Sequence, residues 1–119
     1  MHYRSLLVIR AKPGMRQAMA DFFVARRVVD ECRASIPGFI SAELMLSCDE
    51  PDLACVTVQW ADEASFRQWM SSPVRARQLP DLLPYFEGSP SSRLFETVRA
   101  TRRWESDHPP TCADAPFAS

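Results

Sequence analysis

Hydrophobic residues alternate or cluster in four segments of the chain, and they recur at three- and four-residue steps in two others. The first pattern predicts strands at 3–11, 39–47, 53–60 and 91–104, and the second predicts helices at 15–36 and 63–72. The order β-α-β-β-α-β predicts a ferredoxin-like α+β fold. Segment 73–90 is rich in proline, so we expect one short helix or turn there, followed by irregular chain.

These periods also predict which side chains face the interior. In the first helix the apolar stripe places Phe22, in preference to Phe23, toward the core or a pocket. Three further sets are each predicted to share one face: Ile40, Ala42, Leu44 and Leu46 on the second strand, Val56, Val58 and Trp60 on the third, and Asp62, Ser65, Phe66, Trp69 and Met70 on the second helix. Asp62 is the predicted N-cap of that helix.

The first strand is apolar on both faces. Leu7 and Ile9 lie on one face, and Leu6 and Val8 lie on the other. The helices of a ferredoxin-like fold cover only one face of the sheet, so the second apolar face requires another partner. We therefore expect a homodimer joined sheet to sheet.

Composition indicates one ordinary globular domain, which we place at 1–104, with an irregular tail at 105–119. The net charge of −1 gives no electrostatic case for binding nucleic acid or a membrane surface. No apolar run is long enough to span a bilayer, and the cytoplasm is the expected location. No cysteine pair has C-x-x-C spacing and both histidines lie near the chain ends, so no metal site is expected.

Three stretches of the chain resemble the antibiotic biosynthesis monooxygenase family. They are "VIRAKPGMRQAM", "IPGFISAELMLS" and "VQWADEASFRQWMSSPVRAR". The shared pattern is a strand, "KPG" opening a long helix, "PGF" opening the next strand, a strand-end Trp, and a helix that carries an aromatic residue and a second Trp before "SP". The resemblance covers roughly residues 5 to 100.

The resemblance implies a dimeric α+β barrel with a pocket between the sheet and the helices of each subunit. It also implies, for members that oxidise polyketide aromatics, a reaction without flavin, metal or haem, in which the deprotonated substrate passes electrons directly to oxygen. The protein then has to exclude water, orient the substrate and stabilise its anion. No cofactor is expected.

The resemblance also suggests site residues. Trp69 matches a Trp that lines the family's pocket, and Ser65 stands where quinone-forming relatives carry an Asn, so we assign these two to catalysis. Arg75 stands where those relatives carry a Tyr, and its position is also compatible with a surface residue. Arg93 is the nearest match to an Arg of the last strand. Arg75, Arg93 and Phe22 are the expected substrate-binding residues.

Two functions remain open from the sequence. One is a cofactor-independent monooxygenase that oxidises a small electron-rich aromatic of the phenol, anthrone or quinol type. The other is a non-catalytic dimeric barrel that binds a small aromatic or assists a pathway enzyme. The body of the domain has no His to act as a general base, and it also lacks the His that haem-degrading relatives use to hold iron, so haem degradation is excluded.

Overall fold

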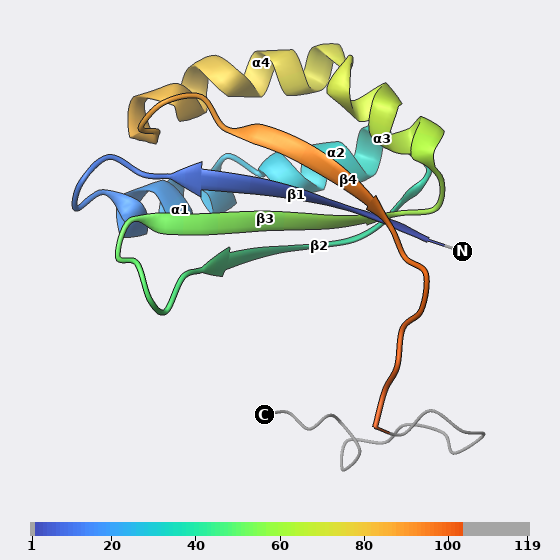
Figure 1. Cartoon of the computed structure of the whole chain (residues 1–119). Coiled ribbons are helices and arrows are strands. Elements are labelled where there is room, and N and C mark those ends of the chain that lie inside the picture. Colours follow the sequence, from blue (N-terminus) through green and yellow to red (C-terminus); the bar gives the residue numbers. More distant parts are fainter. Residues whose placement is uncertain (1, 104–119) are drawn as a thin grey trace.

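A computed structural model describes residues 2–103 of the chain. Four strands form one antiparallel sheet in the order β2-β3-β1-β4, and the helices cover one of its faces (Figure 1). The elements in chain order are β1 Tyr3–Arg10, α1 Arg16–Ala25, α2 Val28–Ser35, β2 Phe39–Leu46, β3 Leu53–Trp60, α3 Glu63–Met70, α4 Pro73–Leu82, the 3-10 turn η1 Leu83–Tyr85 and β4 Ser91–Glu96. This confirms the predicted ferredoxin-like α+β fold.

The register of the sheet decides which residues face the helices. Ser5 pairs with Val58, and Leu7 pairs with Val56 on β3 and with Ser92 on β4. These side chains point toward the helices, whereas Val8 points away and is half exposed. The prediction that β1 is apolar on both faces is therefore confirmed. We call the side of the sheet that carries Leu6 and Val8 the uncovered face.

The predicted long helix at 15–36 is two helices. Arg27 adopts a left-handed conformation with φ of 63° between α1 and α2, and Arg26 bridges Glu31 and Asp81 across this junction. Buried residues follow four-residue steps inside each helix, as in Met19 and Phe23 or Val28 and Cys32. The step from Phe23 to Val28 is longer, and in a straight helix of about 3.6 residues per turn it would place the two residues on different faces. The break absorbs this mismatch.

That break makes the prediction for Phe22 wrong. Phe23 is buried, whereas Phe22 is only half-buried and stacks on Tyr85 with the two ring centroids 5.1 Å apart. A second correction concerns β2, where an irregularity between Phe39 and Ser41 turns Ile40 out to 45% exposure. The remaining predicted inward residues of β2 and β3 face the helices as expected.

The proline-rich segment 73–90 contains more helix than the sequence analysis predicted. Ser72 caps α4 by accepting from Val74 N, and Pro73 occupies the first helical turn, where its missing N–H costs nothing. Pro80 lies near the end of the helix, so it disturbs only the last turn. Strand β4 ends at Glu96, short of the predicted 104. The predicted tail at 105–119 lies outside the described residues.

Candidate functional site

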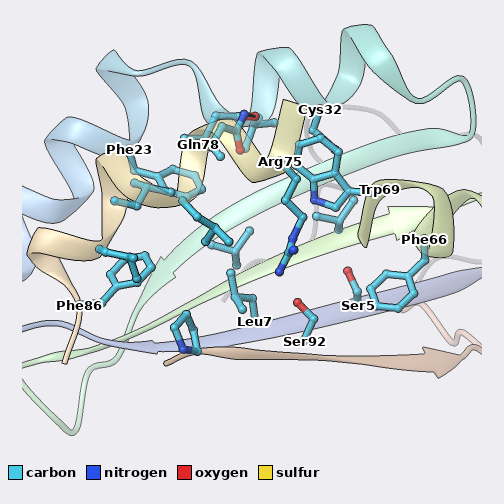
Figure 2. Close-up of a pocket in the computed structure, with 18 of the residues that line it drawn as sticks. Ser5, Leu7, Phe23, Cys32, Phe66, Trp69, Arg75, Gln78, Phe86 and Ser92 are labelled. Carbon is cyan, nitrogen blue, oxygen red and sulfur yellow. Dashed lines mark hydrogen bonds between the residues drawn. The ribbon is translucent and has the colours of Figure 1, made fainter. Parts of the chain in front are cut away.

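A cavity of about 330 Å³ lies between the covered face of the sheet and helices α2, α3 and α4 (Figure 2). Its walls are mostly apolar. The lining residues are Ser5, Leu7, Phe23, Val28, Val29, Cys32, Phe39, Val56, Val58, Phe66, Trp69, Arg75, Gln78, Leu79, Leu82, Leu83, Phe86, Ser89, Pro90 and Ser92. A space of this volume and character suits a small aromatic molecule.

One part of the cavity gathers hydrogen-bond donors, and we call Arg75, Trp69, Ser5 and Ser92 the donor end. Figure 2 shows the Arg75 side chain reaching from α4 into the cavity, with its guanidinium group toward the hydroxyls of Ser92 and Ser5 on the sheet. Trp69 lines the same cavity from α3. Two short helices and two strands therefore converge on one small volume.

Capping interactions fix the two helices that carry these side chains. The Asp62 carboxylate accepts from Ser65 N at 2.8 Å and from the Ser65 hydroxyl at 2.7 Å, which starts α3 and sets the phase that turns Trp69 inward. These hydrogen bonds also lower the pKa of Asp62, the Ser65 hydroxyl having the larger effect. Ser72 and Pro73 start α4 and place Arg75 in its first turn.

Arg75 is the one charged residue among the lining residues that the structure describes. Its side chain makes no ion pair within residues 2–103, and its contact with the Met70 carbonyl is long, at 3.4 Å. A cation that borders an apolar cavity without a carboxylate partner has lost part of its hydration. An anionic ligand would compensate that loss.

Besides Arg75 and Ser92, the donors of Ser5 and Trp69 are also available at this end. Ser5 is buried, and its oxygen accepts from Trp60 Nε1 at 2.9 Å, which leaves its own O–H free to donate. No residue in the described part of the chain accepts from Trp69 Nε1. The donor end thus offers a guanidinium group, an indole N–H and a hydroxyl to whatever occupies the cavity.

The structure brings together only two of the five predicted site residues. Trp69 and Arg75 line the cavity, and Arg75 is not the surface residue that its position also allowed. Ser65 is buried at the start of α3, outside the lining, with its hydroxyl bonded to Asp62. Phe22 lies outside the lining as well. Arg93 pairs with Leu6 and is exposed on the uncovered face, because side chains alternate along β4.

Several lining residues were not singled out from the sequence. Ser5 stands in the inward register of β1 between apolar neighbours, and such a polar interruption was a detectable signal. Gln78 could be recognised as a cavity residue only once the full length of α4 was known, because the helix places it one turn after Arg75 on the same face. Phe23 lines the cavity in place of the predicted Phe22, because the apolar stripe does not continue through the helix break at Arg27.

Cys32 is the titratable thiol of the cavity, and it is not poised for chemistry. Burial raises its pKa to about 12, which keeps the thiol protonated at neutral pH. The described lining contains no Asp, Glu, His or Lys. No group of three or more His, Cys, Asp or Glu side chains gathers within residues 2–103 as a metal site would require. The described lining therefore presents no carboxylate, imidazole or amine that could act as a general base.

The sequence matches the family model described as antibiotic biosynthesis monooxygenase over residues 3–77. Among curated proteins, it is similar to Protein SchA of Streptomyces halstedii, with 28% identity over 98 residues, which cover 82% of this chain and 25% of SchA. The chain thus spans about a quarter of the length of that relative.

Solved structures share the fold. SnoaB from Streptomyces nogalater, a cofactor-independent oxygenase whose structure is that of a point mutant, aligns with a TM-score of 0.67 and 18% identity, covering 83% of this chain and 95% of SnoaB. A conserved protein from Methanosarcina mazei aligns with a TM-score of 0.66 and 17% identity, covering 80% of this chain and 91% of that one.

Proposed function

The chain belongs to the antibiotic biosynthesis monooxygenase family, and we propose that it oxidises a small electron-rich aromatic of the phenol, anthrone or quinol type with molecular oxygen and no added cofactor. One oxygen atom enters the substrate and the other leaves as water, so the substrate supplies all the electrons. The likeness to SnoaB, a cofactor-independent oxygenase, supports this reaction type.

The observation that carries the proposal is that Arg75, which has no ion-pair partner within residues 2–103, lines an apolar cavity together with Trp69. Electron transfer to oxygen is easier from a phenolate or enolate than from the neutral molecule. A guanidinium group close to the ionising oxygen lowers the pKa of the substrate and stabilises the anion. The apolar walls exclude water, and Trp69 fixes the aromatic plane. No general base is needed if the substrate ionises at this site.

The second candidate function is a binding module without catalysis. It is favoured by one observation, namely that the described lining holds no carboxylate, imidazole or amine that could remove a proton. A barrel of this kind would hold an aromatic anion, or assist another enzyme, through the same donor end.

Oxygen uptake separates the two functions. We would add anthrones, hydroquinones and catechols to the purified protein and subtract autoxidation. Arg75→Gln and Trp69→Ala should each lower uptake at least tenfold, whereas Arg77→Gln, an exposed change on the same helix, should leave it unchanged. Tight ligand binding without uptake would establish the binding module, and neither binding nor uptake would refute both functions.

We also propose that the uncovered face joins two copies of the chain. Apolar side chains emerge there from three strands, with Val8 50%, Met45 43% and Phe95 52% exposed. Light scattering should report a dimer that Met45→Asp dissociates and that Val24→Asp, on the exposed side of α1, does not. A monomeric wild-type protein at micromolar concentration would contradict this. The cytoplasmic location stays a prediction.

Across residues 2–103, no helix combines the length and the apolar character needed to cross a bilayer.

A further inference from the structure

Gln78 is the most deeply buried polar side chain of the cavity. It is 2% exposed, and it lies on α4 one turn after Arg75, so the two side chains share a helix face. Figure 2 shows Gln78 on the helix side of the cavity, across from the sheet. A buried amide needs hydrogen-bond partners for both its nitrogen and its oxygen.

The nitrogen of this amide is fully used. Gln78 Nε2 donates to the Val28 carbonyl at 3.2 Å and to Glu31 Oε1 at 2.9 Å. Both partners are acceptors. The Val28 group is a backbone carbonyl, and Glu31 is an ionised carboxylate because the hydrogen bonds from Gln78 and Arg26 lower its pKa. A flipped amide would place its oxygen against a carbonyl and a carboxylate. The orientation of the amide is therefore fixed by its neighbours.

The oxygen of the same amide is free. No residue in the described part of the chain donates to Gln78 Oε1. Within residues 2–103, Thr57 Oγ1 is the one side-chain nitrogen or oxygen that is fully buried and has no hydrogen-bond partner. Gln78 Oε1 also has no partner but is not fully buried, so it keeps some accessible surface. Since Gln78 is almost fully buried and lines the cavity, that surface opens into the cavity. Gln78 thus presents an acceptor only.

We infer that Gln78 is a specificity-determining residue, which accepts a hydrogen bond from a neutral O–H or N–H of the ligand while Arg75 holds the ligand's anionic oxygen. The cavity then selects an aromatic that carries both an ionised acidic oxygen and a protonated donor. This deepens the proposed function, since it specifies the substrate's protonation pattern. The anion is a carboxylate or a phenolate, and both satisfy a guanidinium group.

Matched ligands test this by isothermal titration calorimetry. For the carboxylate source we would use 6-hydroxy-2-naphthoate, whose hydroxyl cannot bond its own carboxylate, its methyl ether and 2-naphthoate, and for the phenolate source a dihydroxynaphthalene and its monomethyl ether. We expect wild type to bind each hydroxy compound about tenfold more tightly than the partner without a donor, which is the typical loss for one unmade buried hydrogen bond. Including 2-naphthoate separates this effect from the bulk of the methyl group.

Variants assign the preference to Gln78. Gln78→Met should abolish it, and Arg75→Gln should weaken the binding of hydroxy and methoxy compounds equally. Gln68→Met, an exposed change on α3, is the matched control and should leave the preference intact. If Gln78→Met fails to fold, Glu31→Gln serves instead. It replaces an acceptor-only carboxylate with an amide that can also donate, so the Gln78 amide is free to turn and the preference should be reduced.

The outcomes keep this inference separate from the proposed function. A tenfold preference without oxygen uptake would support the role of Gln78 and refute the oxygenase. Oxygen uptake together with an unchanged preference in Gln78→Met would refute the role of Gln78 and leave the oxygenase standing. Equal binding of all the matched ligands, or no binding, would also overturn the inference.

Discussion

The two tryptophans that flank the start of α3 lie in opposite environments. Trp60 is fully buried, donates to Ser5, and packs edge-on against Phe39 and Phe66 with ring centroids 6.1 Å away in each case. Trp69 is half-buried, lines the cavity, and has no acceptor for its N–H among the described residues. Where every polar group has a partner, the region is scaffold. Where donors remain free around a cavity, the region is prepared for a ligand.

The largest expected effect comes from removing the scaffold tryptophan. Trp60→Ala should lower the free energy of unfolding by about 3–5 kcal/mol, because it leaves a large cavity and an unpaired Ser5 hydroxyl. Trp69→Ala should cost clearly less, since its side chain borders space that is already open. Urea unfolding followed by circular dichroism measures both. Equal losses would erase the distinction between the two tryptophans.

A second prediction concerns the tight contact beneath α3. A Cβ atom added to Gly38 would lie 2.7 Å from the Ser65 Cβ, so Gly38→Ala should destabilise the protein by about 1–3 kcal/mol. The additional change Ser65→Gly should relieve the collision. Urea unfolding of both single variants and the double variant gives the coupling between them. Strict additivity would mean that the two residues do not touch.

Much of the scaffold could be predicted from the sequence, because it depends on local patterns. A run of β-forming residues identified β1, the shared face of Val56, Val58 and Trp60 identified β3, and the side chain of Asp62 identified the start of α3. Phe22 and Ile40 were misplaced because the break at Arg27 and the irregularity in β2 depend on tertiary packing. No glycine marks either position.

The cavity was only half predictable. Trp69 and Arg75 were named from the resemblance, but the free donors around them depend on which hydrogen bonds form elsewhere. The Ser5 hydroxyl is left to donate because its oxygen already accepts from Trp60 Nε1. The Gln78 oxygen is left to accept because its nitrogen already donates to Glu31. Sequence spacing does not contain this information, since the partners come from separate elements.

A third prediction has the opposite sign from the first two. Arg75→Met should leave the free energy of unfolding unchanged or raise it by about 0.5–1 kcal/mol, because it removes from an apolar cavity a cation that has no ion-pair partner among the described residues. The same change should weaken the binding of aromatic anions at least tenfold. Urea unfolding and calorimetric titration check the two parts. A clear loss of stability would show that Arg75 belongs to the scaffold.

The smallest expected effect is the pH dependence contributed by the Asp62 cap. The pKa of Asp62 is lowered in the folded protein, so its ionised form favours folding. This contribution is complete above the unfolded pKa of about 4 and is lost as the pH falls through the lower folded value. Asp62→Asn keeps a capping oxygen but removes the charge, so its urea midpoint should fall less than that of wild type between pH 6 and pH 3. Asp49→Asn, an exposed change in the turn after β2, is the matched control, and its urea midpoint should fall as much as that of wild type. An identical fall in all three proteins would mean that the charge of Asp62 contributes nothing, and that the hydrogen bonds alone start α3 and direct Trp69 into the cavity.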